Sequence, residues 1–162
     1  MRKMNSQTFD LAKEGARNLV ANMVKVKQKD KVLILTDTLA DRGLIDVLAL
    51  ACREISPETY VMVIRPHKGD NTFGYHPLPQ IVGDTMKEFD VIFAPTYYHV
   101  SGTKATVDLG YSAGGFSGHP RIQGHRVIPM TAYSIDELAS EGARIPIEFL
   151  YVITRRVFKR VR

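Results

Sequence analysis

The chain has 162 residues, 44% of them hydrophobic, so it is long enough to bury an apolar core, and nothing in its composition indicates disorder. A single cysteine excludes an intrachain disulfide, and no stretch approaches the roughly 18 apolar residues of a membrane span, so we expect a cytoplasmic protein without a membrane partner. Five of the 22 Lys and Arg residues lie in the last eight positions, so the first 154 residues carry equal numbers of basic and acidic side chains.

The N-terminal part of the chain alternates helical and strand patterns. From Phe9 to Val26 apolar residues recur every three or four positions, which predicts an amphipathic helix. The short apolar run Lys31–Asp37 predicts a strand buried on both faces, and the largely apolar Asp41–Ile55 predicts a helix that packs on it. The lone thiol, Cys52, falls within this helix, and we interpret it as a core residue rather than a nucleophile.

The alternation continues through the rest of the chain. Further strands are predicted at Glu58–Pro66, Asp90–Pro95 and His125–Thr131, and helices at Leu78–Phe89 and Ser134–Ser140. In the last of these helices Ser134 is expected to be the N-cap, with Glu137 completing a capping box. The glycine-rich stretch Tyr111–Gly124 predicts a long surface loop.

This order of elements predicts the fold class and the division of the chain. Strands that alternate with helices over short connections favour an α/β fold, with an open, mainly parallel sheet of about four to five strands and helices on both faces, a Rossmann-like three-layer arrangement. We expect residues 1–146 to form this α/β domain and residues 147–162 to form a basic helix that leads out of it.

Polar side chains follow the third predicted strand, directly after the buried run "VIFAP". In an open parallel sheet ligands bind beyond the carboxyl ends of the strands, where loop side chains are exposed. We therefore expect this loop to line a substrate cleft, and we do not expect its residues to be catalytic. The alternative is that its hydroxyls cap the following helix and its rings cover the edge of the sheet. The candidate cleft residues are Thr96, Tyr97, Tyr98, His99, Ser101, Thr103 and Lys104.

Several familiar site patterns are missing from the sequence. It contains neither GxGxxG nor GxxxxGK[ST], so a dinucleotide or P-loop nucleotide site is not expected. Its five histidines include no HExxH and no pair at i, i+4 spacing, and no carboxylate cluster accompanies them. We therefore predict no catalytic residue, no metal ligand and no bound cofactor within this chain.

Several segments resemble those of one protein family, both in their sequences and in their order along the chain. "KQKDKVLILTDT", "EFDVIFAPTYYHVSGTKA" and "RVIPMTAYSIDEL" are similar to the N-terminal domain of the thermophilic-type metallo-aminopeptidases, the aminopeptidase T or leucyl aminopeptidase family. The matching positions are Asp90–Pro95, Thr103–Ala105 and Val127–Leu138, and Tyr111–Gly124 looks inserted relative to the family pattern.

The resemblance implies a two-domain exopeptidase that releases N-terminal amino acids from peptides. In such an enzyme two divalent metal ions, zinc, cobalt or manganese, are held by a C-terminal domain, where they activate water and polarise the scissile carbonyl. The present chain would then be the N-terminal domain or a truncated form, inactive alone. It would line the cleft for a peptide or amino-acyl substrate, with the C-terminal metal-binding domain and possibly a second copy of itself as partners.

Three other interpretations stay open. A ring-cleaving dioxygenase shares the same domain plan, so resemblance of fold does not determine the reaction. The chain would otherwise be a free-standing α/β module that binds a small ligand. A nucleic-acid-associated role through the basic C-terminus is the third interpretation, but no binding motif accompanies the charge, and nucleic acid is not the partner we expect.

Overall fold

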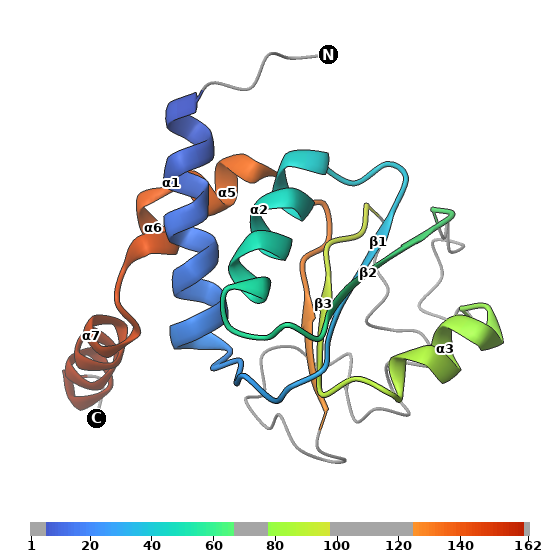
Figure 1. Cartoon of the computed structure of the whole chain (residues 1–162). Coiled ribbons are helices and arrows are strands. Elements are labelled where there is room, and N and C mark those ends of the chain that lie inside the picture. The colour runs from blue at the N-terminus through green and yellow to red at the C-terminus, as the bar shows by residue number, and fades with distance from the viewer. Residues whose placement is uncertain (1–5, 67–77, 98–124, 161–162) are drawn as a thin grey trace, which may run out of the picture.

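The computed structural model describes residues 6–66, 78–97 and 125–160, and its strands and helices alternate along the chain (Figure 1). The strands are β1 (Val32–Asp37), β2 (Thr59–Ile64), β3 (Val91–Ala94) and β4 (Arg126–Pro129). The helices are α1 (Ser6–Arg17), the π-helix η1 (Asn18–Met23), α2 (Arg42–Arg53), α3 (Gln80–Met86), α5 (Ile135–Ala139), α6 (Glu141–Arg144) and α7 (Ile147–Arg160).

The described strands form one parallel sheet in the order β2-β1-β3-β4. Val32 of β1 aligns with Thr59 of β2 on one side and with Val91 of β3 on the other, and Val91 in turn aligns with Arg126 of β4. The carboxyl ends of all these strands therefore meet at one edge of the sheet. The predicted α/β class with a parallel sheet is confirmed.

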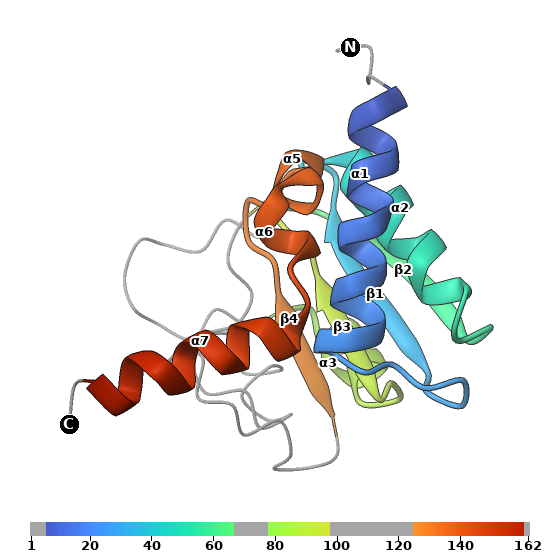
Figure 2. The ribbon, with the colours of Figure 1, turned by 90° about the vertical axis from the view of Figure 1, so that its left-hand side faces the viewer.

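Helices cover both faces of the sheet and make three layers. Helices α1, α2 and α5 lie on one face and α3 lies on the other (Figures 1 and 2). Alternate side chains of β1 enter the two cores: Val32 and Ile34 pack with α1 and α2, while Leu33 and Leu35 pack with α3. This is the predicted arrangement of helices on both faces.

The central strands are as buried as their apolar composition requires. Every residue of β1 and β3 is buried, and Val91, Ile92 and Phe93 are wholly inaccessible, as predicted. Cys52 is also inaccessible, and burial raises the pKa of its thiol to about 12. A thiol that stays protonated in the core is a packing residue, which confirms the interpretation made from the sequence.

The first predicted helix is present but changes its winding. From Asn18 the backbone continues as the π-helix η1, a feature that no pattern in the sequence predicted. The Asn18 side chain is nearly buried, and its Nδ2 donates to the carbonyl oxygens of Ala143 at 2.8 Å and Ile145 at 3.0 Å. Asn18 therefore ties the N-terminal helix to the segment that leads into α7.

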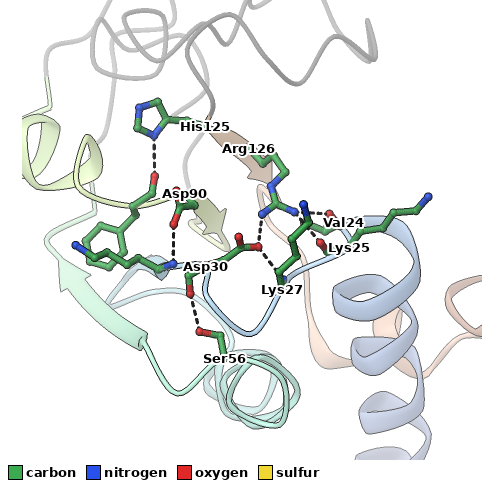
Figure 3. A network of polar contacts seen from close by, with 10 residues as sticks. Val24, Lys25, Lys27, Asp30, Ser56, Asp90, His125 and Arg126 are labelled. Carbon is green, nitrogen blue, oxygen red and sulfur yellow. Dashed lines mark hydrogen bonds and ion pairs between the residues drawn. The ribbon is translucent and has the colours of Figure 1, made fainter.

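A polar network holds the amino ends of the strands together (Figure 3). Arg126 at the start of β4 pairs with the carboxylate of Asp30, and both side chains are largely buried. The Arg126 guanidinium also donates to the carbonyl oxygens of Val24 at 2.8 Å and Lys25 at 2.9 Å, where Lys25 has a positive φ of 57°. One side chain therefore joins β4 to the turn that precedes β1.

Neighbouring contacts extend this network across the edge of the sheet (Figure 3). The Ser56 hydroxyl donates to the Asp30 carbonyl at 2.6 Å, and the Lys31 N–H donates to the Asp90 carboxylate at 2.8 Å. The ring of His125 donates from Nδ1 to the Phe89 carbonyl at 2.7 Å. The side chains at this edge bind backbone groups of their own chain, so their role here is structural.

Helix α7 projects away from the three layers (Figure 2). Its first turns expose apolar side chains, with Phe149 56% and Tyr151 69% accessible and Leu150 and Val152 also exposed. The sequence predicted a helix from residue 147 onward, and α7 begins there. That this helix leads to a further domain stays a prediction.

Candidate functional site

A hollow lies at the carboxyl ends of β1, β3 and β4, the edge of the sheet where ligands are expected. Its volume is about 220 Å³. A water molecule takes up about 30 Å³ of the liquid, so the hollow has room for a group the size of an amino acid but not for a dinucleotide. The lining residues come from the loops that follow the three strands: Leu39, Ala40, Asp41, Thr96, Tyr97, Ala132, Tyr133 and Ser134.

Asp37, the last residue of β1, fixes the first two of these loops. One oxygen of its buried carboxylate accepts from the N–H groups of Leu39 at 2.8 Å and Ala40 at 3.0 Å. The other oxygen accepts from the N–H of Tyr97 at 2.7 Å. The carboxylate therefore joins the β1 loop to the β3 loop beneath the hollow.

Asp41 makes the matching connection to the third loop. Its Oδ1 accepts from the N–H of Gly43 at 2.8 Å and caps α2, which is the use that a helix N-terminus makes of an Asp side chain. Its Oδ2 accepts from the N–H of Ile135 at 2.8 Å, at the start of α5. Both carboxylates of the β1 loop are thus occupied by backbone N–H groups, and their first role is to set the shape of the hollow.

The loop after β4 closes the hollow from the other side. Ala132 has a φ of 55°, the left-handed region, and its N–H donates to the carbonyl of Thr96 at 2.9 Å. This bend presents the next side chain, Tyr133, which is 45% exposed. Tyr97 from the β3 loop is 49% exposed, so two tyrosine rings border the same hollow.

The capping box predicted for α5 is present at the rim. The Glu137 carboxylate accepts from the Ser134 N–H at 2.7 Å and from the Ser134 hydroxyl. The hydrogen bond from the Ser134 side chain is the main reason that the pKa of Glu137 lies below its usual value. Because Ser134 also lines the hollow, the box fixes the position of a lining residue.

We expect the Glu137→Ala variant to unfold with about 1 kcal/mol less free energy than the wild type at neutral pH, because a helix cap is lost. The lowered pKa means that this stabilisation is present above the unfolded-state pKa and is lost as the pH falls through the folded-state pKa. Urea unfolding from neutral to acid pH measures it. Glu137→Gln keeps an acceptor and should remove the pH dependence while keeping most of the stability, whereas equal stability of Glu137→Ala and wild type at neutral pH would contradict the assignment.

The structure describes two of the seven candidate cleft residues, and one expectation about them is wrong. Thr96 was expected to be at least partly accessible after the buried strand, but it is 2% exposed. The reason is that the β4 loop folds over it and bonds to its carbonyl, so Thr96 forms the floor of the hollow. Tyr97 lies at the rim. The candidates outside the described residues are Tyr98, His99, Ser101, Thr103 and Lys104, whose place in the cleft stays a prediction.

The contribution of the β4 loop to the hollow was not predicted. Ser134 was expected only as a helix cap and Tyr133 was not a candidate, although both follow a predicted strand of the same sheet. Ligands bind beyond the carboxyl ends of parallel strands, and this holds for the fourth strand as it does for the third. The left-handed conformation of Ala132 could not be predicted from the residue type, because alanine does not favour that conformation.

The metal ions implied by the family resemblance do not fit the described residues. Within residues 6–66, 78–97 and 125–160, no three His, Cys, Asp or Glu side chains lie close enough together to hold an ion. The carboxylates of Asp37 and Asp41 accept hydrogen bonds from backbone N–H groups.

Within the described residues, no helix has the length and apolarity to cross a bilayer.

The fold and the hollow define an α/β domain with a small site at the carboxyl edge of its sheet. No family model matches the sequence, and no curated protein matches it. Among solved structures, the chain is similar to 2,5-dihydroxypyridine dioxygenase from Pseudomonas putida KT2440, with 12% identity and a TM-score of 0.42. The similar region covers 57% of this chain and 29% of the dioxygenase chain, and a similarity this low supports no conclusion about activity.

Proposed function

We propose that this chain is the α/β domain of a metal-dependent aminopeptidase and forms one wall of its substrate cleft. The observation that carries the proposal is the position of the hollow, which lies at the carboxyl edge of the sheet between the β3 and β4 loops. Two of the segments that resemble the aminopeptidase family, Asp90–Pro95 and Val127–Leu138, cover β3 and most of β4 and α5. The resemblance therefore includes two of the strands whose carboxyl ends border the hollow.

The described residues suit binding rather than bond cleavage. Two half-exposed tyrosine rings border a hollow with room for one amino-acid side chain or backbone unit, and aromatic residues at such positions supply large contact area. The described residues provide no set of metal ligands, so the two divalent ions would be held by a second domain, whose bound metals would supply the Lewis acid and the activated water. The exposed apolar turns of α7 offer that domain a surface to pack on.

Two activity measurements test the proposal. The purified chain with zinc, cobalt or manganese should release no amino acid from amino-acyl amides above the blank, and metal-dependent turnover by the chain alone would contradict the division of roles. The domain combined with the metal-binding domain that the proposal requires should show that turnover. Consumption of oxygen with a dihydroxypyridine and no peptide hydrolysis would instead identify the ring-cleaving alternative.

In the active enzyme, we expect Tyr133→Ala to raise KM for an amino-acyl amide about tenfold, equivalent to roughly 1.4 kcal/mol of binding energy. The reason is that Tyr133 supplies one of the two rings at the hollow. Leu50→Ala is the matched control, because Leu50 is equally exposed at 45% but lies near the far end of α2. Equal KM values for the two variants would remove Tyr133 from the substrate site.

A free-standing binding module is a second candidate, and one observation favours it. The described residues that line the hollow lie on three loops of this chain, and carboxylates hold these loops in place. Calorimetric titration with amino acids and dipeptides separates the candidates: tight binding by the isolated chain would favour the module, and weak binding would favour a cleft completed by a second domain.

A further inference from the structure

The outer edge of β2 is the least protected part of the described sheet. The strand lies at the end of the order β2-β1-β3-β4, and its sequence "TYVMVI" contains no charged residue and no proline. Tyr60 is 50%, Val61 37% and Val63 51% exposed, so apolar side chains are accessible on both faces of the strand. Natural sheets usually protect an edge with charges, proline or a covering element, because an uncovered edge pairs with other strands.

The backbone of β2 has a defined set of outward-pointing groups. The Val32 N–H donates to the Glu58 carbonyl at 2.8 Å, so the polar groups of Glu58 face β1. Because these groups alternate along a strand, Tyr60, Met62 and Ile64 also face β1, while Thr59, Val61, Val63 and Arg65 present their N–H and C=O groups to the outer edge. Each of these four residues has an N–H to donate.

We infer that this edge binds a second copy of the same strand, antiparallel and related by a two-fold axis centred on Met62. In that register Val61 lies opposite Val63, and Thr59 lies opposite Arg65, so every outward-pointing residue meets a partner. Centring the axis on Val61 would place Arg65 opposite Pro57, which has no N–H to donate. The backbone groups therefore favour the register centred on Met62 over the one centred on Val61.

The side chains of β2 support the same partner. In this register Tyr60 lies opposite Ile64 on the face covered by α3, so apolar groups meet apolar groups across the interface. The strand is flanked by Glu58 at one end and Arg65 at the other. Antiparallel pairing brings the acidic end of one copy to the basic end of the other, whereas parallel pairing would bring like charges together. A second copy thus meets both the hydrogen-bonding and the charge requirements of this edge.

Crosslinking tests the register directly. Met62 of one copy would lie opposite Met62 of the other as a non-hydrogen-bonded pair, a position where Cα atoms are about 4.5 Å apart and a disulfide can form. We expect Met62→Cys to give a covalent dimer under mild oxidation. Val61→Cys should give much less, because Val61 of one copy lies opposite Val63 of the other and not opposite Val61. The natural Cys52 does not interfere, since it is buried and its thiol pKa is raised.

Sedimentation velocity over a dilution series tests the association itself. The wild-type chain should show a monomer–dimer equilibrium, and Val63→Pro should abolish the dimer, because it removes an outward N–H and spares the bonds to β1. Val61→Lys provides a second disruption if the proline variant does not fold, and Ile81→Lys, at a residue 75% exposed on α3, is the matched control that should still dimerise. A monomeric wild type, or a dimer that neither β2 variant weakens, would overturn the inference. It does not depend on the proposed function.

Discussion

The Gly15→Ala variant should lose about 3 kcal/mol of unfolding free energy or fail to fold, the upper part of the range for overpacked cores. A Cβ at Gly15 would stand 2.0 Å from the carbonyl oxygen of Leu138 and 3.1 Å from the Cβ of Ala143. The first of these atoms belongs to the backbone of α5 and cannot rotate away. Alanine favours a helix over glycine by about 1 kcal/mol, but this gain is smaller than the cost of separating α1 from α5.

Gly142→Ala is the matched control for this prediction. A Cβ at Gly142 would meet only the Ser140 Oγ at 3.8 Å, an ordinary contact, so this variant should be as stable as the wild type or slightly more stable. Both variants are measured by urea unfolding. If Gly15→Ala unfolds at the same midpoint as Gly142→Ala, the close packing of α1 on the backbone of α5 is wrong.

The Arg126→Met variant should lose about 3–5 kcal/mol of unfolding free energy, because it leaves the buried carboxylate of Asp30 without its cation. Two backbone carbonyl oxygens, those of Val24 and Lys25, also lose their donor. The turn in which Lys25 has a positive φ then depends on fewer contacts. A loss of this size is a large share of the 5–15 kcal/mol that stabilises a typical domain, so the urea midpoint should fall clearly.

Arg17→Met is the matched control for Arg126→Met. Arg17 forms two hydrogen bonds with Glu54, at 2.7 Å and 2.6 Å, but about half of each side chain is exposed to water. Exposed pairs contribute about 0–1 kcal/mol, so this variant should change stability little. Losses of similar size in the two variants would show that burial of the Arg126 pair does not have the importance assigned to it.

The elements of the fold were predictable because their hydrophobic patterns are strong. The buried strands at Lys31–Asp37 and Asp90–Pro95 consist of apolar runs with charged or proline residues at their ends, and the structure places β1 and β3 within them. The capping box at Ser134 and Glu137 was also predicted, because its residue types and spacing carry the mechanism. Local chemistry thus determined what forms at each position along the chain.

Contacts between distant segments were not predictable from one sequence. Arg126 and Asp30 are 96 residues apart, and no local pattern marks either as half of a buried pair. The side chain of Asn18, where the π-helix begins, likewise binds the carbonyl oxygens of Ala143 and Ile145, which lie more than a hundred positions away. Such pairings follow from the order of strands in the sheet, which periodicity does not specify.

The candidate site was partly predictable for the same reason. The sequence indicated the edge of the sheet at which the hollow lies, because the carboxyl end of a buried strand can be recognised from the polar residues that follow it. The prediction that Thr96 is accessible was wrong, since its burial depends on the β4 loop folding over the β3 loop. The roles of Asp37 and Asp41 as loop anchors also required the geometry of three strands at once.

Two-dimensional ¹H–¹⁵N NMR of the chain during titration with leucinamide is the most direct test of the central claim that the carboxyl edge of the sheet binds an amino-acyl substrate. The account predicts amide shift changes at residues 39–41, 96–97 and 132–134, which line the hollow, and in the predicted cleft residues that follow Tyr97. The amino-edge network around Arg126 should not change. An absence of shifts at high ligand concentration, or shifts confined to other parts of the chain, would contradict the claim.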